Sequence, residues 1–310
     1  MTPVLEAVKL GKRYGRHHAL TDIDLNVPPG RVIGLVGPNG AGKPTLLQLA
    51  CGLITPSSGT IRVLGDAPAA GPAHLAKVGF VAQDAPLYAE LSVADHLQMG
   101  ARLNPGWDSA LARHRLARID LDPLQKAGRL SGGQRAQLAL TIAAAKRPEL
   151  LIFDEPAAAL DPLARHAFLD HLLESVTDLG AAAILSSHAL PDIERVCDHL
   201  IVLAGSRVQL AGDVTQLMAD HVRVTAHRSD LLALPTAADV ITRTDPSDRE
   251  GTAVVRADRA LLAGGPWTTT GVGLEELALA YLDRADRSET RPSPSLRPEA
   301  PTSTVAEDHR

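Results

Sequence analysis

The chain has 310 residues, of which 45% are apolar and 22% charged, and its formal net charge is −5. This length fits one large domain with an appendage, and the acidic balance argues against nucleic acid as the main partner, because phosphate backbones attract basic surfaces. We expect no secretory signal at the first residues and no membrane span of ~20 apolar residues, so action at a membrane would require another chain.

Short strand-like runs alternate with helical patterns through the first two thirds of the chain. Strands are predicted at 4–10, 19–27, 31–36, 60–64, 78–81, 150–154, 182–186, 200–203 and 207–210. Several of these runs are continuously apolar and bounded by turn residues, which is typical of buried strands in a parallel sheet. The alternation predicts an α/β fold with a mainly parallel core sheet.

Three later stretches differ from this pattern. Residues 89–147 are rich in Leu, Ala and Arg without a convincing strand, which predicts a helical insertion. Residues 213–285 predict a small accessory α+β segment, with Asp213 capping a short helix, weak strands at 222–226 and 252–256, and a helix over 274–285. Residues 286–310 carry almost no large apolar side chains and are predicted to be a disordered tail.

A glycine-rich loop lies between the predicted strand at 31–36 and a helical stretch at 45–51. Its residues are Gly37, Pro38, Asn39, Gly40, Ala41, Gly42 and Lys43. Glycines let backbone N–H groups converge on phosphate oxygens, the helix N-terminus adds a favourable dipole, and the lysine reaches the β- and γ-phosphates. The pattern predicts a nucleotide site, although a glycine-rich turn with a surface lysine would look similar, and such loops also occur in many kinases and GTPases.

Two acidic residues end the apolar strand predicted at 150–154. Asp154 and Glu155 are therefore expected at the carboxyl edge of the sheet, where the phosphates lie. We predict that Asp154 holds Mg²⁺ through water and that Glu155 polarises the attacking water.

The pentapeptide 130–134, Leu-Ser-Gly-Gly-Gln, precedes the acidic strand. Together with the two preceding motifs it resembles the signature of ABC transporter ATP-binding subunits, most of all the stand-alone subunits of ABC-2-type exporters. It is a second glycine-opened helix N-terminus that can bind a γ-phosphate. The signature lies in the helical insertion, away from the glycine-rich loop 37–43 of the same chain, which is called the P-loop. The resemblance therefore implies a head-to-tail pair in which each ATP lies between the P-loop of one subunit and the signature of the other. The signature residues are Ser131, Gly132, Gly133 and Gln134.

The resemblance covers residues 4–212 and implies roles for four more residues. Tyr14 matches the aromatic residue that stacks on adenine, and Gln83 matches the glutamine that contacts Mg²⁺ and the attacking water and senses the membrane partner. Asp161 matches the loop that crosses the dimer, and His188 matches the switch histidine at the γ-phosphate. The implied fold is a P-loop NTPase ABC cassette over 1–212, with an antiparallel β-subdomain and a helical subdomain at about 89–147.

The resemblance also implies the function and the partners. The chain would bind and hydrolyse ATP with Mg²⁺, dimerise head to tail on ATP, and drive an integral membrane permease on a separate chain, in the direction of export. The second ABC subunit would be an identical copy or a different chain. The expected location is the cytoplasmic face of the cell membrane, held there by the permease.

Pro44 departs from the family pattern, in which the P-loop lysine is followed by Ser or Thr. Proline offers neither the hydroxyl that ligates Mg²⁺ nor the N–H that holds the β-phosphate. It also disfavours helical dihedrals at the preceding residue, so we expect Lys43 to be displaced from them. Thr45 is a candidate substitute, although its use would require the loop to slip by one residue. We therefore predict that Mg²⁺-dependent ATP binding and hydrolysis are weaker than in a typical relative.

Two other readings compete with an active transport ATPase. One is a regulatory or heterodimeric ABC subunit that dimerises on ATP but barely hydrolyses it, which Pro44 favours. The other is an ABC protein of translation or DNA repair, but such proteins usually carry two cassettes in one chain, or long coiled-coil or zinc insertions, and this sequence has none of these.

Overall fold

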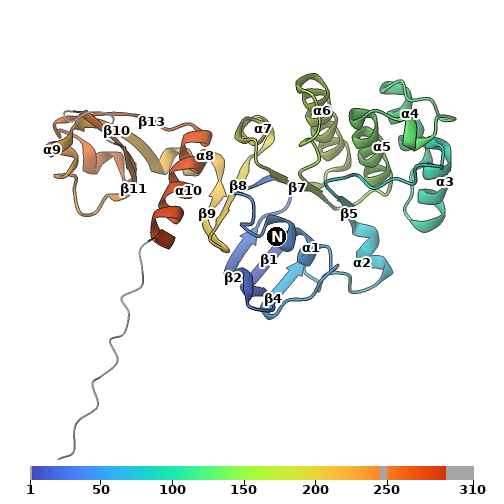
Figure 1. Cartoon of the computed structure of the whole chain (residues 1–310), viewed down its shortest axis with the longest axis horizontal. Coiled ribbons are helices and arrows are strands. Elements are labelled where there is room, and N and C mark those ends of the chain that lie inside the picture. Colours follow the sequence, from blue (N-terminus) through green and yellow to red (C-terminus); the bar gives the residue numbers. More distant parts are fainter. Residues whose placement is uncertain (1, 245–249, 291–310) are drawn as a thin grey trace, which may run out of the picture.

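The computed structural model describes residues 2–244 and 250–290 of the chain. Figure 1 shows a core sheet with helices along one side, a second sheet near the N-terminus and a third, accessory sheet next to the last helix. No helix in these described ranges is long and apolar enough to cross a membrane.

The core sheet has six strands in the order β5-β6-β7-β3-β8-β9. Their bounds are β5 Val78–Val81, β6 Leu150–Asp154, β7 Ala182–Ser187, β3 Val32–Val36, β8 His199–Ala204 and β9 Arg207–Asp213. The first five strands are parallel and β9 is antiparallel to β8. Every residue of β3, β6, β7 and β8 is buried, which explains their continuous apolar runs. The predicted α/β fold with a mainly parallel sheet is confirmed.

A three-stranded antiparallel sheet, β2-β1-β4, packs against the core beside the first helix. It consists of β1 Leu5–Tyr14, β2 His17–Val27 and β4 Ser58–Val63, and helices α1 Lys43–Ala50 and α2 Pro72–Lys77 flank β4 in the chain. The strands β1 and β2 are longer than predicted because the turn between them takes only Gly15 and Arg16.

The insertion between β5 and β6 is built of helices joined by loops. The helices are α3 Val93–Leu103, α4 Ser109–Arg118, a short 3-10 turn Ala127–Arg129 and α5 Gly132–Ala145. These helices enclose a small core of their own that includes Val93, Leu116 and Leu138. The predicted helical subdomain is confirmed, and α6 Pro162–Leu179 and α7 Leu190–Val196 complete the helical layer over the core sheet.

The accessory part contains α8 Val214–Asp220, β10 His221–His227, α9 Arg228–Leu231, β11 Asp239–Thr244, β12 Glu250–Arg256, a 3-10 turn Arg259–Leu262, β13 Trp267–Gly271 and α10 Leu274–Thr290. Its strands form an antiparallel sheet in the order β11-β12-β10-β13. The predicted helix cap is confirmed, because Asp213 Oδ1 accepts the N–H of Gln216. The sequence missed β11 and β13, which are edge strands; residues 268–271 of β13 are all exposed and show no apolar alternation.

Helix α10 joins the accessory sheet to the core. Its buried residues Leu277 and Tyr281 share one apolar cluster with Val202 of β8 and Ile241 of β11. The predicted disorder from residue 286 is wrong for 286–290, which continue this helix. Elongation of a helix already anchored by packing requires little free energy per residue, and the Arg287–Asp283 pair one turn apart supports the last turns. Residues 291–310 of the predicted tail lie outside the described residues.

Candidate nucleotide site

The P-loop connects the end of β3 to the start of α1, and its glycines are required by close contacts. Gly42 adopts φ +103°, and a Cβ on it would lie 2.4 Å from the carbonyl oxygen of Ala19. A Cβ on Gly37 would lie 2.1 Å from the carbonyl oxygen of Leu203. Larger residues at these two positions would push the loop away from the strands β2 and β8 that hold it. The sequence therefore uses glycine to seat the loop tightly on the core.

Lys43 points back into the loop that precedes it. Its side chain is buried, its Nζ donates to the carbonyl oxygen of Gly37 at 2.7 Å, and the same Nζ lies 3.4 Å from Oε1 of Glu155. The expectation that Pro44 displaces Lys43 from the helix is wrong, because α1 begins at Lys43 with Pro44 as its second residue. Proline is accommodated there because N–H groups of the first helical turn have no intrahelical acceptor to lose.

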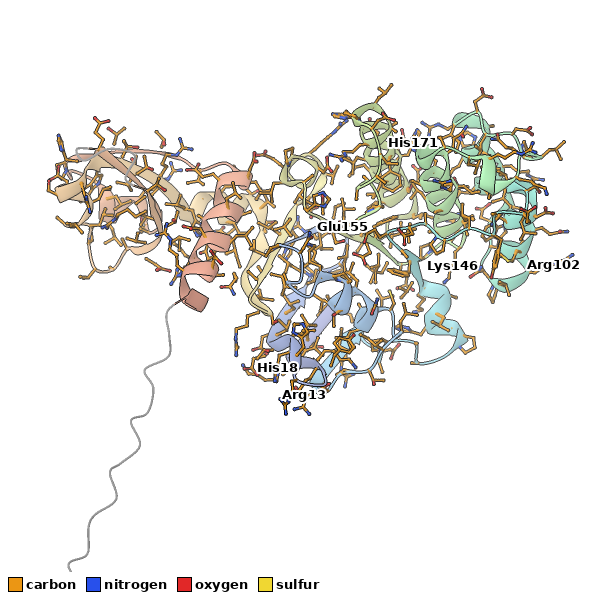
Figure 2. All side chains as sticks on the ribbon, viewed as in Figure 1. Arg13, His18, Arg102, Lys146, Glu155 and His171 are labelled. Atoms are coloured by element: carbon orange, nitrogen blue, oxygen red, sulfur yellow. The ribbon has the colours of Figure 1, made fainter. Side chains whose placement is uncertain are left out.

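Glu155 follows β6 in a left-handed backbone conformation, with φ +45°. Its N–H donates to Oγ of Ser186 at 2.8 Å, and its Oε2 lies 3.1 Å from Nδ1 of His188. Figure 2 labels Glu155 near the middle of the molecule, between the helical layer and the N-terminal sheet that carries His18. The carboxylate thus lies between the lysine of the P-loop and the histidine that follows β7.

Asp154, the last residue of β6, is buried and accepts a hydrogen bond from Oγ of Ser186 at 2.8 Å. The pKa of Asp154 lies above its ordinary value, mainly because burial disfavours the charged carboxylate and also because the negative charge of Glu155 is close. The hydrogen bond from Ser186 and the ammonium of Lys43 act in the opposite direction. Ser186 was not predicted as a site residue. The signal available was its place near the end of a predicted strand, two residues before His188, but nothing in the sequence said which strand lies beside β7.

Gln83 and Tyr14 lie at the borders of this site. Gln83 is exposed just after β5, and since Val81 pairs with Phe153, it emerges at the same sheet edge as Asp154. Tyr14 is exposed at the end of β1, where the ammonium of Lys12 lies 5.2 Å from the centre of its ring. Within the described residues, neither side chain forms a hydrogen bond or ion pair with the P-loop or the acidic pair, so their predicted roles stay predictions.

The signature residues begin α5. Ser131 caps this helix by accepting the N–H of Gln134 at 3.2 Å, and Oε1 of Gln134 accepts the N–H of Ser131 at 2.9 Å. Asp161 caps α6 in the same way, since its Oδ1 accepts the N–H groups of Leu163 and Ala164. In the described part of the chain, no hydrogen bond or ion pair joins these residues to the P-loop. The structure therefore does not bring all the predicted site residues together within one chain.

The P-loop on a parallel sheet, with an acidic strand end beside its lysine, defines a P-loop nucleotide-binding protein. Residues 20–158 match the family described as ABC transporter. The chain is 34% identical over 275 residues to the "Nod factor export ATP-binding protein I" of Cupriavidus pinatubonensis, which covers 85% of this chain and 84% of that protein. It is 34% identical over 249 residues to the "Molybdenum import ATP-binding protein ModC" of Rhodobacter capsulatus, covering 78% and 68%.

A solved structure of an ATP-binding subunit of an ABC transporter matches with a TM-score of 0.62 and 31% identity, covering 69% of this chain and 91% of that one. The chain therefore belongs to the ABC transporter family, as an ATP-binding subunit. Such subunits are ATPases that work with a membrane permease. The predicted family and the predicted ATPase class are confirmed.

Proposed function

We propose that this chain binds ATP with Mg²⁺, hydrolyses it as one of a head-to-tail pair, and thereby drives a separate integral membrane permease. The observation that carries the proposal is the 3.4 Å contact between Lys43 and Glu155. These two residues lie far apart in the sequence, yet the parallel sheet brings the P-loop lysine and the acidic strand end to one place. Phosphate binding and water activation require that proximity.

The residues around Lys43 fit the phosphates of ATP. The loop lies at the N-terminus of α1, Lys43 supplies the positive charge, and Tyr14 would stack on the adenine. Asp154 and Gln83 would hold Mg²⁺, which neutralises phosphate charge when bound. Because Pro44 has no hydroxyl, these metal ligands lack the one that Ser or Thr supplies in the usual P-loop. The nearest hydroxyl in the sequence belongs to the half-buried Thr45.

Within the chain, Glu155 is the group that would take the proton of the attacking water. His188, at 3.1 Å from its carboxylate, would orient Glu155 and reach toward the γ-phosphate. The opposite subunit would add the signature residues Ser131 to Gln134 and the loop that ends at Asp161. This arrangement is supported by the absence of any hydrogen bond between signature and P-loop in the described residues, and by the exposed position of Ser131.

Subunit mixing tests the head-to-tail pair. The variant Lys43→Ala disables the P-loop and Gly132→Asp disables the signature, so each variant alone is expected to be inactive. A mixture of the two contains pairs in which one composite site is intact, and we expect it to recover a substantial fraction of the wild-type ATP turnover. If the mixture stays as inactive as its components while ATP-induced pairing persists, the head-to-tail arrangement is wrong.

We further propose that the permease docks beside Gln83. A cavity of about 340 Å³ lies between the loop after β5 and helix α5, and half-buried apolar residues such as Phe80, Leu87 and Ile142 line it. A cytoplasmic segment of the permease with an apolar face would fit there and hold the chain at the inner face of the membrane. Purification of the tagged full chain from membranes is expected to yield one integral membrane protein; recovery without any would contradict a permease partner.

Export is the direction that we propose. The relative named for Nod factor export aligns over most of both chains, whereas the relative named for molybdenum import aligns over 68% of its own length. Vesicles that contain the chain and its co-purified permease test the direction. ATP supplied on the side that carries the chain is expected to move substrate away from that side, and uptake toward it would reverse the assignment.

The second candidate function is a subunit that pairs on ATP but hydrolyses it slowly, alone or opposite a different ABC chain with a complete P-loop. Pro44 is the observation that favours it. Measurement of ATP-induced pairing and of ATP turnover on the same preparation separates the candidates. Pairing with turnover at the level of a buffer blank supports the second candidate, and pairing with steady turnover supports the first.

We also propose that residues 1–212 form the ATP-binding domain and 213–285 an accessory segment.

A further inference from the structure

Ser186 is a fully buried polar residue between the two acids of the site. It lies on β7 in direct register with Asp154 on the neighbouring parallel strand β6. Its Oγ makes two hydrogen bonds of 2.8 Å, one with the carboxylate of Asp154 and one with the main-chain N–H of Glu155. No role was predicted for this residue, and the proposed chemistry does not use it.

The direction of these two hydrogen bonds follows from the donors available. A backbone N–H can only donate, so Oγ of Ser186 accepts from Glu155. The single hydroxyl proton of Ser186 is then directed to Oδ1 of Asp154. These two hydrogen bonds orient the carboxylate of Asp154 through its Oδ1. The second carboxylate oxygen, Oδ2, is left for another ligand.

The second hydrogen bond acts on the main chain. Glu155 has φ +45°, a left-handed conformation that residues with a Cβ rarely adopt. The bond from its N–H to Ser186 anchors this conformation at the point where the chain leaves β6. The carboxylate of Glu155 reaches both Lys43 and His188 from that anchored backbone.

We propose that Ser186 is a positioning residue of the nucleotide site, whose one hydroxyl both orients Asp154 toward the divalent cation of the nucleotide and fixes the backbone from which Glu155 reaches the attacking water. The inference rests on the proposed function of the site. It predicts that loss of the hydroxyl weakens the contribution of the metal to ATP binding and slows turnover, while metal-free ATP binding is preserved.

The experiment compares Ser186→Ala, Ser186→Thr and Ser186→Val in the full-length chain. Thr keeps the hydroxyl, and Val has the same shape as Thr without it, so this pair separates hydrogen bonding from packing. Ser175→Ala is the matched control, because Ser175 is equally buried and its hydroxyl donates to the carbonyl oxygen of His171 on α6, outside the site. Calorimetric titration measures ATP affinity in EDTA and in Mg²⁺, and steady-state assays measure turnover.

For Ser186→Ala and Ser186→Val we expect the gain in ATP affinity on adding Mg²⁺ to fall on the order of 10-fold, and turnover to fall about 10- to 100-fold, because each loses a hydrogen bond to a charged group. ATP affinity in EDTA is expected to stay within about twofold of wild type. Ser186→Thr and Ser175→Ala are expected to keep both the Mg²⁺ gain and the turnover.

Four results would overturn the inference. An unchanged Mg²⁺ gain in a folded Ala or Val variant would show that the hydroxyl is dispensable. Equal losses of affinity in EDTA and in Mg²⁺ would show a general structural defect instead of positioning, as would a folded Thr variant as impaired as the Val variant. A wild-type chain that binds no ATP under either condition would overturn the proposed function first, and this inference with it.

Discussion

The imidazole Nδ1 of His188 lies 3.1 Å from Oε2 of Glu155, although 33 positions separate the two residues in the chain. Both residues follow neighbouring parallel strands, β6 and β7, at their carboxyl ends. The contact places a group that can donate or accept a proton directly beside the acid of the proposed hydrolysis.

Replacing Glu155 by Gln keeps the size of the side chain but removes its ability to accept a proton from water. We expect turnover of ATP to fall by roughly 10²- to 10⁴-fold, the usual contribution of general acid–base catalysis. ATP binding is expected to persist, because the variant leaves the P-loop and the positive charge of Lys43 at the start of α1 unchanged. Equilibrium binding and phosphate release measure the two effects. Glu149→Gln, an exposed acid paired with Lys77, is the control, and equal rates in the two variants would contradict the role of Glu155.

Replacing Pro44 by Ser restores both a hydroxyl and a backbone N–H at the start of α1. We expect Mg²⁺-dependent ATP turnover to rise, because one hard oxygen ligand and one amide donor together contribute on the order of 2–4 kcal/mol. Pro44→Ala restores only the N–H and so separates the two contributions. Steady-state assays over a range of Mg²⁺ concentrations measure both variants. Identical rates in wild type and Pro44→Ser would contradict the prediction.

Truncating Leu277 to Ala is expected to destabilise the whole chain. Leu277 is fully buried in the cluster that α10 shares with the core strands, and Leu-to-Ala changes in such positions cost about 2–5 kcal/mol of unfolding free energy. Leu279, 51% exposed on the same helix, is the matched control, and its change to Ala is expected to alter the free energy by about 0.5 kcal/mol or less. Denaturant titration measures both, and similar losses would show that α10 does not anchor the fold.

Stability is expected to fall as the pH drops below about 6.5, the ordinary pKa of histidine. Burial lowers the pKa of His221 in the folded chain, where its Nδ1 contacts the carbonyl oxygen of Leu217 and its Nε2 the hydroxyl of Tyr281. Below pH 6.5, His221 of the unfolded chain binds a proton that it does not bind in the folded chain. The free energy of unfolding therefore falls by at most about 1.4 kcal/mol per pH unit.

The variant His221→Leu tests this pH dependence. It is expected to flatten the decline in melting temperature between pH 7 and pH 5.5, even if its stability at neutral pH is lower. His114→Leu, at an exposed position of α4, is the matched control for the loss of one imidazole. An equally steep decline in wild type and His221→Leu would contradict the assignment of the proton uptake to His221.

The sequence predicted the core strands well because each is a buried apolar run, and β6 ends at Asp154 as expected. It failed on the edge strands β11 and β13, where exposed threonines such as Thr269 carry no periodicity, and on residues 286–290, whose helix depends on packing earlier in α10. Local composition carries no information about which distant surface will cover a segment.

The sequence by itself determined the family and supplied the motifs on which the proposed chemistry rests: a glycine loop with Lys43, two acids after an apolar strand, and a second helix that begins with glycines, after Ser131. Only the tertiary structure decided which of these meet. The parallel pairing of β6 with β7 brings Ser186 between Asp154 and Glu155 and sets His188 against Glu155, while the helical layer holds Ser131 apart. The physical reason is that strand order in a parallel sheet is set by crossover connections and packing between layers, which no local motif encodes.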